Sequence, residues 1–139
     1  MTFRRGDVLW IRCDPSVGVE PKKTRTCVVV SNDRANEDRD WRAVTVVTTR
    51  SYAAKDAWRP YLVDIRAPRS NLSEKRFANC SQVMTYDRDR IVKSGGRVSL
   101  AAILDIDRAL KLHLSLDESL LEVHERHVAY DLATKRRRG

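Results

Sequence analysis

The sequence predicts a mainly β protein with α, a small and strongly bent barrel of the SH3-like type with a C-terminal amphipathic helix and an appended helical tail. Three observations support this prediction. Six short apolar segments, rich in β-branched residues, are separated by polar turns. One segment with helical periodicity follows them. The length of 139 residues suffices for one core and is too small for two.

Three strands are expected in the first half of the chain, at residues 7–13, 25–32 and 43–49. The first strand alternates, with Leu9, Ile11 and Cys13 on one face and Val8 and Trp10 on the other. Residues 14–24, the lid loop, are polar and rich in Pro and Gly. Residues 34–42 are almost wholly charged and predict a solvated loop. Because that connection is short, the second and third strands are expected to pair as an antiparallel hairpin.

Three further strands are expected at residues 61–66, 76–85 and 91–98, with an interruption of the second near Gln82. An irregular basic segment precedes the first of them, and residues 87–90 read as a helical turn. Ser99 is expected to cap the helix that follows. That helix carries an apolar stripe at steps of three and four, which predicts a face packed on the core: Ile103, Ile106, Leu110 and Leu114.

The domain boundary is expected after Leu116, with residues 1–116 as the barrel domain and 117–139 as a helical extension with a basic end. The 27 Lys and Arg exceed the 19 Asp and Glu by eight. Residues 117–139 hold five acidic and five basic side chains, so the surplus lies in the barrel domain. Such a surplus suits a polyanion such as RNA or DNA, or an acidic protein partner.

The distribution of histidine and cysteine argues against several kinds of site. All three histidines lie at or beyond residue 113, so a histidine-based triad or histidine-pair nuclease is not expected in the barrel. The acidic pairs do not suit a metal site. Cys13, Cys27 and Cys80 lack metal-type spacing and predict reduced core thiols in a cytosolic protein. No signal peptide and no membrane span are expected, and neither a cofactor nor a metal.

The residue that stands out is Arg25, where the lid loop becomes a buried strand. The predicted hairpin places Thr48 or Thr49 opposite, and a guanidinium beside a hydroxyl is a good seat for a phosphate diester. The alternative is a surface ion pair of Arg25 with Glu20 or Asp33. Trp41 and Trp58 lie in basic loops and could stack on unpaired bases, or could be partly buried aromatics that close the barrel end or a dimer interface.

Several ordered blocks of this chain resemble the MazF/PemK (Kid) toxins of bacterial type II toxin–antitoxin modules. The resemblance spans about residues 3–116. It rests on Arg5-Gly6-Asp7-Val8, Asp14-Pro15-Ser16-Val17-Gly18-Val19-Glu20, Thr24-Arg25, Val28-Val29-Val30-Ser31-Asn32-Asp33, Val44 to Thr48, Gln82-Val83-Met84-Thr85-Tyr86-Asp87 with Arg90, and Asp107-Arg108-Ala109-Leu110. The chain departs from the family at Thr26, where proline is usual, and at Pro21-Lys22-Lys23, where a glycine-rich lid is usual.

The resemblance implies a homodimeric, metal-independent and ribosome-independent endoribonuclease that cuts single-stranded messenger RNA at a short base sequence. It implies cytoplasmic action, products with 2′,3′-cyclic phosphate and 5′-hydroxyl ends, and a MazE-like antitoxin whose acidic C-terminal segment lies in the RNA groove. By position, the family's catalytic residues fall on Arg25 and Thr48, with Glu20 as a candidate base. The RNA-binding residues expected here are Ser16, Lys22, Lys23, Asn32, Trp41, Arg50 and Gln82.

Two other functions remain compatible with the sequence. A DNA gyrase poison of the CcdB kind would share the fold without being an enzyme, although the basic end of this chain lacks that family's aromatic C-terminus. A basic SH3-like module could also bind nucleic acid without cutting it. Incubation with RNA in EDTA discriminates, because the ribonuclease would cut at one short motif, whereas a binding module would retain the RNA without cutting it.

Overall fold

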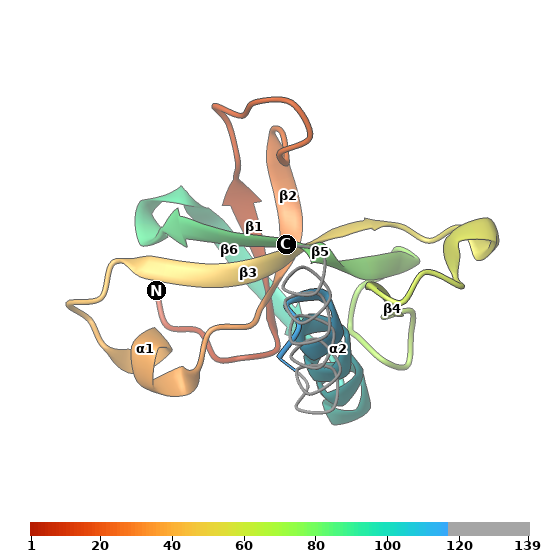
Figure 1. Cartoon of the computed structure of the whole chain (residues 1–139). Helices are drawn as coiled ribbons and strands as arrows, with labels where there is room; N and C mark the ends of the chain where they lie inside the picture. Colours follow the sequence, from red (N-terminus) through yellow and green to blue (C-terminus); the bar gives the residue numbers. More distant parts are fainter. Residues whose placement is uncertain (117–139) are drawn as a thin grey trace, which may run out of the picture.

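The computed structural model describes residues 1–116, and these form one bent sheet with a helix packed on it (Figure 1). The strands are β1 (Asp7–Arg12), β2 (Thr24–Val29), β3 (Ala43–Ser51), β4 (Leu62–Asp64), β5 (Arg76–Asp87) and β6 (Ile91–Arg97). The helices are α1 (Asp33–Glu37), η1 (Ala54–Asp56), η2 (Arg88–Arg90) and α2 (Leu100–His113). All six predicted strands are confirmed, as is the class of mainly β with α. The predicted extension, residues 117–139, lies outside the described residues.

The sheet is antiparallel, with the order β4-β5-β3-β2-β1-β6. The predicted hairpin of the second and third strands is confirmed, because β2 and β3 pair with Cys27 opposite Thr48. In Figure 1, β3 and β5 run across the molecule while β1 and β2 rise from it, and α2 lies below the crossing. This bend carries the lid loop above one end of β3.

The bent sheet contributes side chains from its two faces to two cores, so neighbouring residues of one strand, such as Val8 and Leu9, are both buried. The face toward α2 forms one core, from residues such as Val8, Val47 and Ile106. The other face curls around a second core, which includes Leu9, Ile11 and Cys13. The predicted division of the first strand into two faces is therefore confirmed, with Trp10 packed against the first core. All three cysteines are buried thiols.

Helix α2 begins after Ser99, whose hydroxyl accepts a hydrogen bond from the backbone N–H of Ala102, so the predicted cap is confirmed. The predicted apolar stripe is only partly correct. Ile106 is buried, and Ile103 and Leu110 pack against the core, but Leu114 is exposed because the helix ends at His113. The rest of the buried face is made by alanines, which allow the helix to approach the sheet closely. No helix of the described region is long and apolar enough to cross a bilayer.

The prediction of a solvated loop over residues 34–42 is wrong in its first part, where α1 forms. Asn32 caps this helix by accepting a hydrogen bond from the N–H of Ala35. Asn36 turns inward and is buried, held by Ser31 and Asp33. The charged side chains around it are exposed, so the sequence of this segment shows no apolar residue that would indicate a buried side of a helix. An irregular segment expected after β3 likewise contains the short helix η1.

Candidate active site

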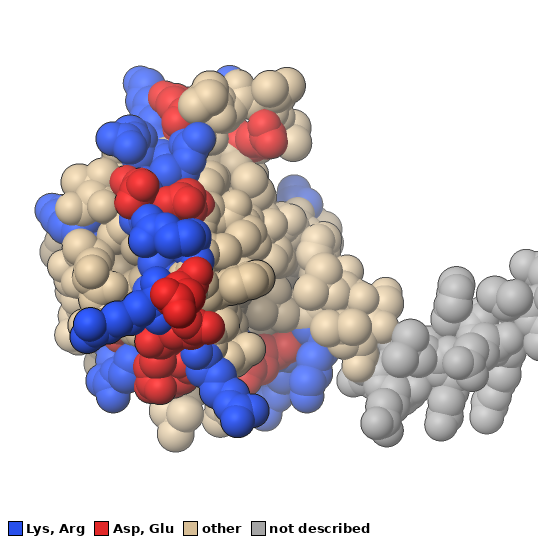
Figure 2. Space-filling view, turned by 90° about the vertical axis from the view of Figure 1, so that its left-hand side faces the viewer, with Lys and Arg blue, Asp and Glu red and all other residues tan. Residues whose placement is uncertain are grey.

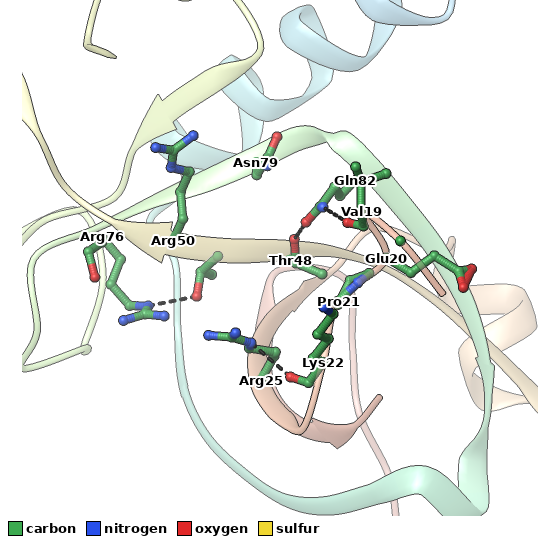
Figure 3. A pocket seen from close by; sticks show the side chains of 13 residues that line it. Val19, Glu20, Pro21, Lys22, Arg25, Thr48, Arg50, Arg76, Asn79 and Gln82 are labelled. Atoms are coloured by element: carbon green, nitrogen blue, oxygen red, sulfur yellow. Dashed lines mark hydrogen bonds between the residues drawn. The ribbon is translucent and has the colours of Figure 1, made fainter. Parts of the chain in front are cut away.

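A cavity of about 550 Å³ opens between the lid loop and the strands β3 and β5 (Figure 3). Six of the residues predicted for catalysis or RNA binding line this cavity: Glu20, Lys22, Arg25, Thr48, Arg50 and Gln82. We call it the Arg25 pocket. Its lining holds four cationic side chains and a single carboxylate, that of Glu20, so it favours an anion.

The register of the sheet explains how Thr48 comes to this pocket. Val47 pairs with Val83 of β5, but the next residue, Thr48, pairs with Asn79. The ladder therefore skips residues 80–82, which form a bulge, and the predicted interruption near Gln82 is confirmed. The bulge releases Gln82 from pairing with β3 and brings its amide against Thr48. Both threonines line the pocket, with Thr48 opposite Cys27 and the Thr49 hydroxyl donating to the Thr26 carbonyl at 3.0 Å, so the assignment of Thr48 stays a prediction.

Gln82 connects Thr48 to the lid loop. The Thr48 hydroxyl donates to Gln82 Oε1 at 2.5 Å, and Gln82 Nε2 donates to the Val19 carbonyl at 3.0 Å. Figure 3 shows these two bonds in series across the pocket. Thr48 itself is only 2% exposed, so its hydroxyl is held in one place on the rigid strand β3. The position of the lid loop and the donor of Thr48 are thus coupled through one amide.

Arg25, the second residue of β2, projects into the pocket and is exposed. Its Nε donates to the Lys22 carbonyl at 2.9 Å, which orients the guanidinium. Within residues 1–116 it forms no ion pair, so the alternative of a surface pair with Glu20 or Asp33 is not observed. Asp33 instead accepts from the N–H of Arg5. The guanidinium of Arg25 is therefore available to an anionic ligand.

Glu20 lines the pocket, but its carboxylate is engaged elsewhere. Its Oε1 accepts a hydrogen bond from the N–H of Val17 at 2.8 Å, inside the lid loop. Figure 3 shows the carboxylate pointing away from both Arg25 and Thr48. A role for Glu20 at the reacting atoms would therefore require the lid loop to change conformation.

Two buried thiols, those of Cys13 and Cys27, lie close to the backbone of Arg25. The interaction between the two thiols lowers the pKa of Cys13 to about 6, against the opposing effect of burial, and together with burial it raises the pKa of Cys27. The positive charge of Arg25 acts on both thiols, and that of Arg76 acts on Cys27. The charges of two arginines of the pocket therefore act on one thiol, and Arg76 is a lining residue that the sequence analysis did not single out.

The other predicted RNA-binding residues do not line the Arg25 pocket. Ser16 lies in a separate cavity under the lid loop, and Lys23 is exposed beside it. Asn32 caps α1, and Trp41 is exposed in the turn after it. Trp58, 72% exposed and stacked with Arg59, does not close the barrel end. Their part in binding RNA stays a prediction.

Charge elsewhere on the surface is more evenly compensated. Figure 2 shows acidic and basic side chains alternating along the face that carries α1. Arg42 on this face pairs with both Asp87 and Asp89. The mixture gives this face less attraction for a polyanion than the Arg25 pocket has, where four cations meet one acid.

Fold and site together define a small β protein with a basic, open groove for an anionic chain. The model of the PemK-like, MazF-like toxin family of type II toxin–antitoxin systems matches residues 4–114. Endoribonuclease MazF9 of Mycobacterium tuberculosis is 40% identical over 117 residues, which cover 82% of this chain and 98% of the relative. Endoribonuclease EndoA of Bacillus subtilis is 28% identical over 116 residues, 84% of this chain and 97% of the relative. The chain therefore belongs to the PemK/MazF toxin family, and the resemblance inferred from the sequence is confirmed.

Solved structures agree with this fold. MazF from Deinococcus radiodurans superposes with a TM-score of 0.69 at 17% identity, covering 83% of this chain and 98% of its own. An endoribonuclease from a mycobacterial species, solved in complex with its cognate antitoxin, superposes with a TM-score of 0.64 at 24% identity, covering 84% and 98%. At these identities the likeness concerns the fold.

Proposed function

We propose that this MazF-family endoribonuclease cuts single-stranded RNA at a short base sequence, without metal and without the ribosome, through Arg25 and Thr48. The observation that carries the proposal is that both side chains line one basic pocket while the Arg25 guanidinium forms no ion pair within the described residues. A planar guanidinium and a fixed hydroxyl suit the oxygens of one phosphate diester.

RNA supplies its own nucleophile in this reaction. The 2′-hydroxyl oxygen attacks phosphorus, the bond from phosphorus to the 5′-oxygen breaks, and the products carry a 2′,3′-cyclic phosphate and a 5′-hydroxyl. The protein has to align the attack, stabilise charge on the pentavalent phosphorus and return a proton to the leaving 5′-oxygen. We assign Arg25 to the phosphate and to that proton, and Thr48 to a non-bridging oxygen.

The proton of the 2′-hydroxyl needs an acceptor. The protonated guanidinium of Arg25 has no acceptor atom and cannot take this proton, although it can donate one to the more basic 5′-alkoxide that leaves. Glu20 is the carboxylate in the lining of the pocket and is our candidate. For this role its hydrogen bond to the N–H of Val17 must open, so that the carboxylate turns from the lid loop toward the substrate. Substrate binding and assembly of the base would then be one event.

Thr48 sets a similar condition. Its hydroxyl has one proton, which it donates to Gln82 in the free protein. To donate to a phosphate oxygen, Thr48 must release Gln82, and that amide also holds Val19 of the lid loop. RNA entering the pocket would therefore free the Gln82 amide, which becomes available to a base. This supports Gln82 as an RNA-binding residue.

The same pocket suits the acidic segment of an antitoxin. In this proposal the chain works in the cytoplasm as a homodimer, and a MazE-like partner lays an acidic C-terminal segment over the pocket. Support comes from the four cations of the lining, and from the mycobacterial structural neighbour that was solved with its cognate antitoxin. Carboxylates of such a segment would compete with phosphates for Arg25.

The test is cleavage of a long RNA in EDTA by wild type, Arg25→Ala and Thr48→Val, with the 5′ ends of the fragments mapped. We expect cutting at one short motif by wild type and a loss of about a hundredfold or more in each variant. Thr48→Ser should restore most of the activity because it restores the hydroxyl. Arg108→Ala, an exposed arginine of α2 paired with Asp105, is the matched control. Undiminished cutting by a folded Arg25 or Thr48 variant would remove that residue from the site.

The same assay, with measurements of RNA retention and of DNA gyrase inhibition, decides between the three functions. Retention of RNA without fragments would favour a non-catalytic binding module. Neither retention nor cutting, together with inhibition of DNA gyrase, would favour a poison of the CcdB kind. Cutting that stops in EDTA would contradict the metal-independent mechanism.

A further inference from the structure

Arg76, the first residue of β5, contributes a second guanidinium to the Arg25 pocket, and nothing in the sequence pattern marks it. Its side chain is only 13% exposed. Nε donates to the Thr49 hydroxyl at 2.7 Å, and Nη1 donates to Glu74 at 2.8 Å. Within residues 1–116, Nη2 forms no hydrogen bond. Figure 3 shows Arg76 and Arg25 extending into the same hollow from different strands.

The anchor of Arg76 is rigid. The Thr49 hydroxyl that receives its Nε donates in turn to the Thr26 carbonyl of β2 at 3.0 Å. One hydroxyl thus joins β2, β3 and the side chain from β5, so the guanidinium is held before any ligand arrives. A cation held in this way loses little conformational freedom when it binds an anion.

The charge of Arg76 is also less compensated than that of its neighbour Arg50. Arg50 pairs with Asp56, a carboxylate only 9% exposed that also holds Arg59. Arg76 pairs only with Glu74, whose side chain is 75% exposed and well screened by water. Of the three arginines in the lining, Arg25 and Arg76 therefore remain more available to a ligand than Arg50 does.

The position of Arg76 separates it from the proposed reaction centre. Its backbone pairs with Ser51 in the ladder, and its Nε reaches back along β3 to the hydroxyl of Thr49. Thr49 follows Thr48 on β3, and consecutive residues of a strand point to opposite faces of the sheet, so Arg76 enters the pocket from the side of Thr49 and not from that of Thr48. One phosphate held by Arg25 and Thr48 therefore leaves Arg76 facing the next position along the bound strand.

We infer that Arg76, anchored by Thr49, binds the phosphate adjacent to the scissile one, which makes this corner of the pocket a second phosphate subsite. The inference rests on the proposed function, because Arg25 and Thr48 define the scissile position. Arg76 is a binding residue in this scheme. It fixes the register of the RNA and takes no part in the proton transfers.

The test measures binding of an oligonucleotide that carries the mapped motif with a 2′-deoxy nucleotide at the cleavage position, so that it is not cut. In a series of such oligonucleotides, one phosphodiester at a time is replaced by an uncharged methylphosphonate. Wild type should lose about tenfold or more in affinity when a linkage next to the scissile one is neutralised. Arg76→Ala should bind the unmodified oligonucleotide about tenfold or more weakly than wild type does. Neutralising the adjacent linkage should then weaken its binding no further. Its dependence of log affinity on log salt should be shallower by about 0.7.

Two further variants address folding and anchoring. Glu74→Gln changes an exposed side chain, and releasing Arg76 from it should tighten binding only of oligonucleotides that keep the adjacent phosphate. Thr49→Val removes the anchor and should weaken the same oligonucleotides, while Thr49→Ser should not. Arg108→Ala should match wild type throughout.

Different results would overturn the inference. If Arg76→Ala folds and binds every oligonucleotide as wild type does, Arg76 has no role in binding. If its loss disappears only when the scissile linkage is neutralised, Arg76 binds that phosphate and the second subsite does not exist. A wild type that cuts no RNA would instead refute the proposed function.

Discussion

The buried amide of Asn36 offers a stringent test of how this fold is held together. Asn36 lies in α1, inside a segment that looks fully solvated in sequence, yet it is 3% exposed. Its Oδ1 accepts from the Ser31 hydroxyl at 2.6 Å, and its Nδ2 donates to the Ser31 carbonyl at 2.9 Å and to Asp33 at 3.2 Å. Asn36→Ala removes all three hydrogen bonds and leaves the backbone in place.

The three partners of Asn36 differ in which other hydrogen bonds they keep after the substitution. The Ser31 hydroxyl keeps contacts with the backbone of Thr45, and Asp33 keeps the N–H of Arg5. The Ser31 carbonyl loses the donor that Asn36 provided. Leaving the buried Ser31 carbonyl unpaired costs about 1–3 kcal/mol. An ordinary hydrogen bond contributes about 0.5–1.5 kcal/mol, and the loss of each of the other two bonds adds part of that amount. We therefore expect Asn36→Ala to lower the free energy of unfolding by about 2–4 kcal/mol.

Urea or guanidinium denaturation measures this loss as a lower midpoint with an unchanged slope. The control is Asn32→Ala, which removes the exposed cap of the same helix and should cost about 1 kcal/mol. Below the unfolding transition Asn36→Ala should cut RNA like wild type, because Asn36 does not line the Arg25 pocket. An Asn36→Ala protein destabilised by less than the Asn32→Ala protein would refute this accounting.

Two further predictions concern stability. Gly6→Ala should lower the free energy of unfolding by about 1–3 kcal/mol, as measured by denaturation. The reasons are that φ of Gly6 is +92° and that the new Cβ would lie 2.6 Å from Ile103 Cδ1. Gly18→Ala is the control and should cost less, because φ is +58° and no atom lies within 4 Å of the new Cβ. The N–H of Arg5 lowers the pKa of Asp33 in the folded state, so its contribution is present above about pH 4 and is lost as the pH falls through the folded pKa. Asp33→Asn should therefore flatten the fall in stability on acidification, and an unchanged acid limb would contradict this.

The strands of this fold could be predicted because each is a short apolar run closed by turn residues. The two-sided pattern of residues 7–13 was correct in detail, since the two faces of this strand pack in two cores. Helix α1 could not be predicted from apolar periodicity, because its buried side chain is that of an asparagine, Asn36. Leu114 was misplaced because the stripe it continues in sequence ends with the helix at His113. Residues 117–139 remain a prediction.

The site shows a different limit. Arg25 and Thr48 could be identified from the chemistry of the residues and from the family blocks, and the structure brings them to one pocket. Arg76 could not be identified, because in sequence it is only the polar start of a strand. Its position in the pocket depends on the pairing of β5 with β3 and on the hydroxyl of Thr49.

Two consecutive threonines of β3 line the pocket, and each hydroxyl is paired with a side chain from a different part of β5. Consecutive residues of a strand point to opposite faces of the sheet, so the two hydroxyls meet different partners. The Thr48 hydroxyl donates to Gln82, which the bulge at residues 80–82 frees from pairing with β3. The Thr49 hydroxyl accepts from Arg76, which pairs with Ser51 in the regular part of the ladder. The bulge therefore supplies the partner of the reaction centre, and the regular ladder supplies the proposed second phosphate subsite.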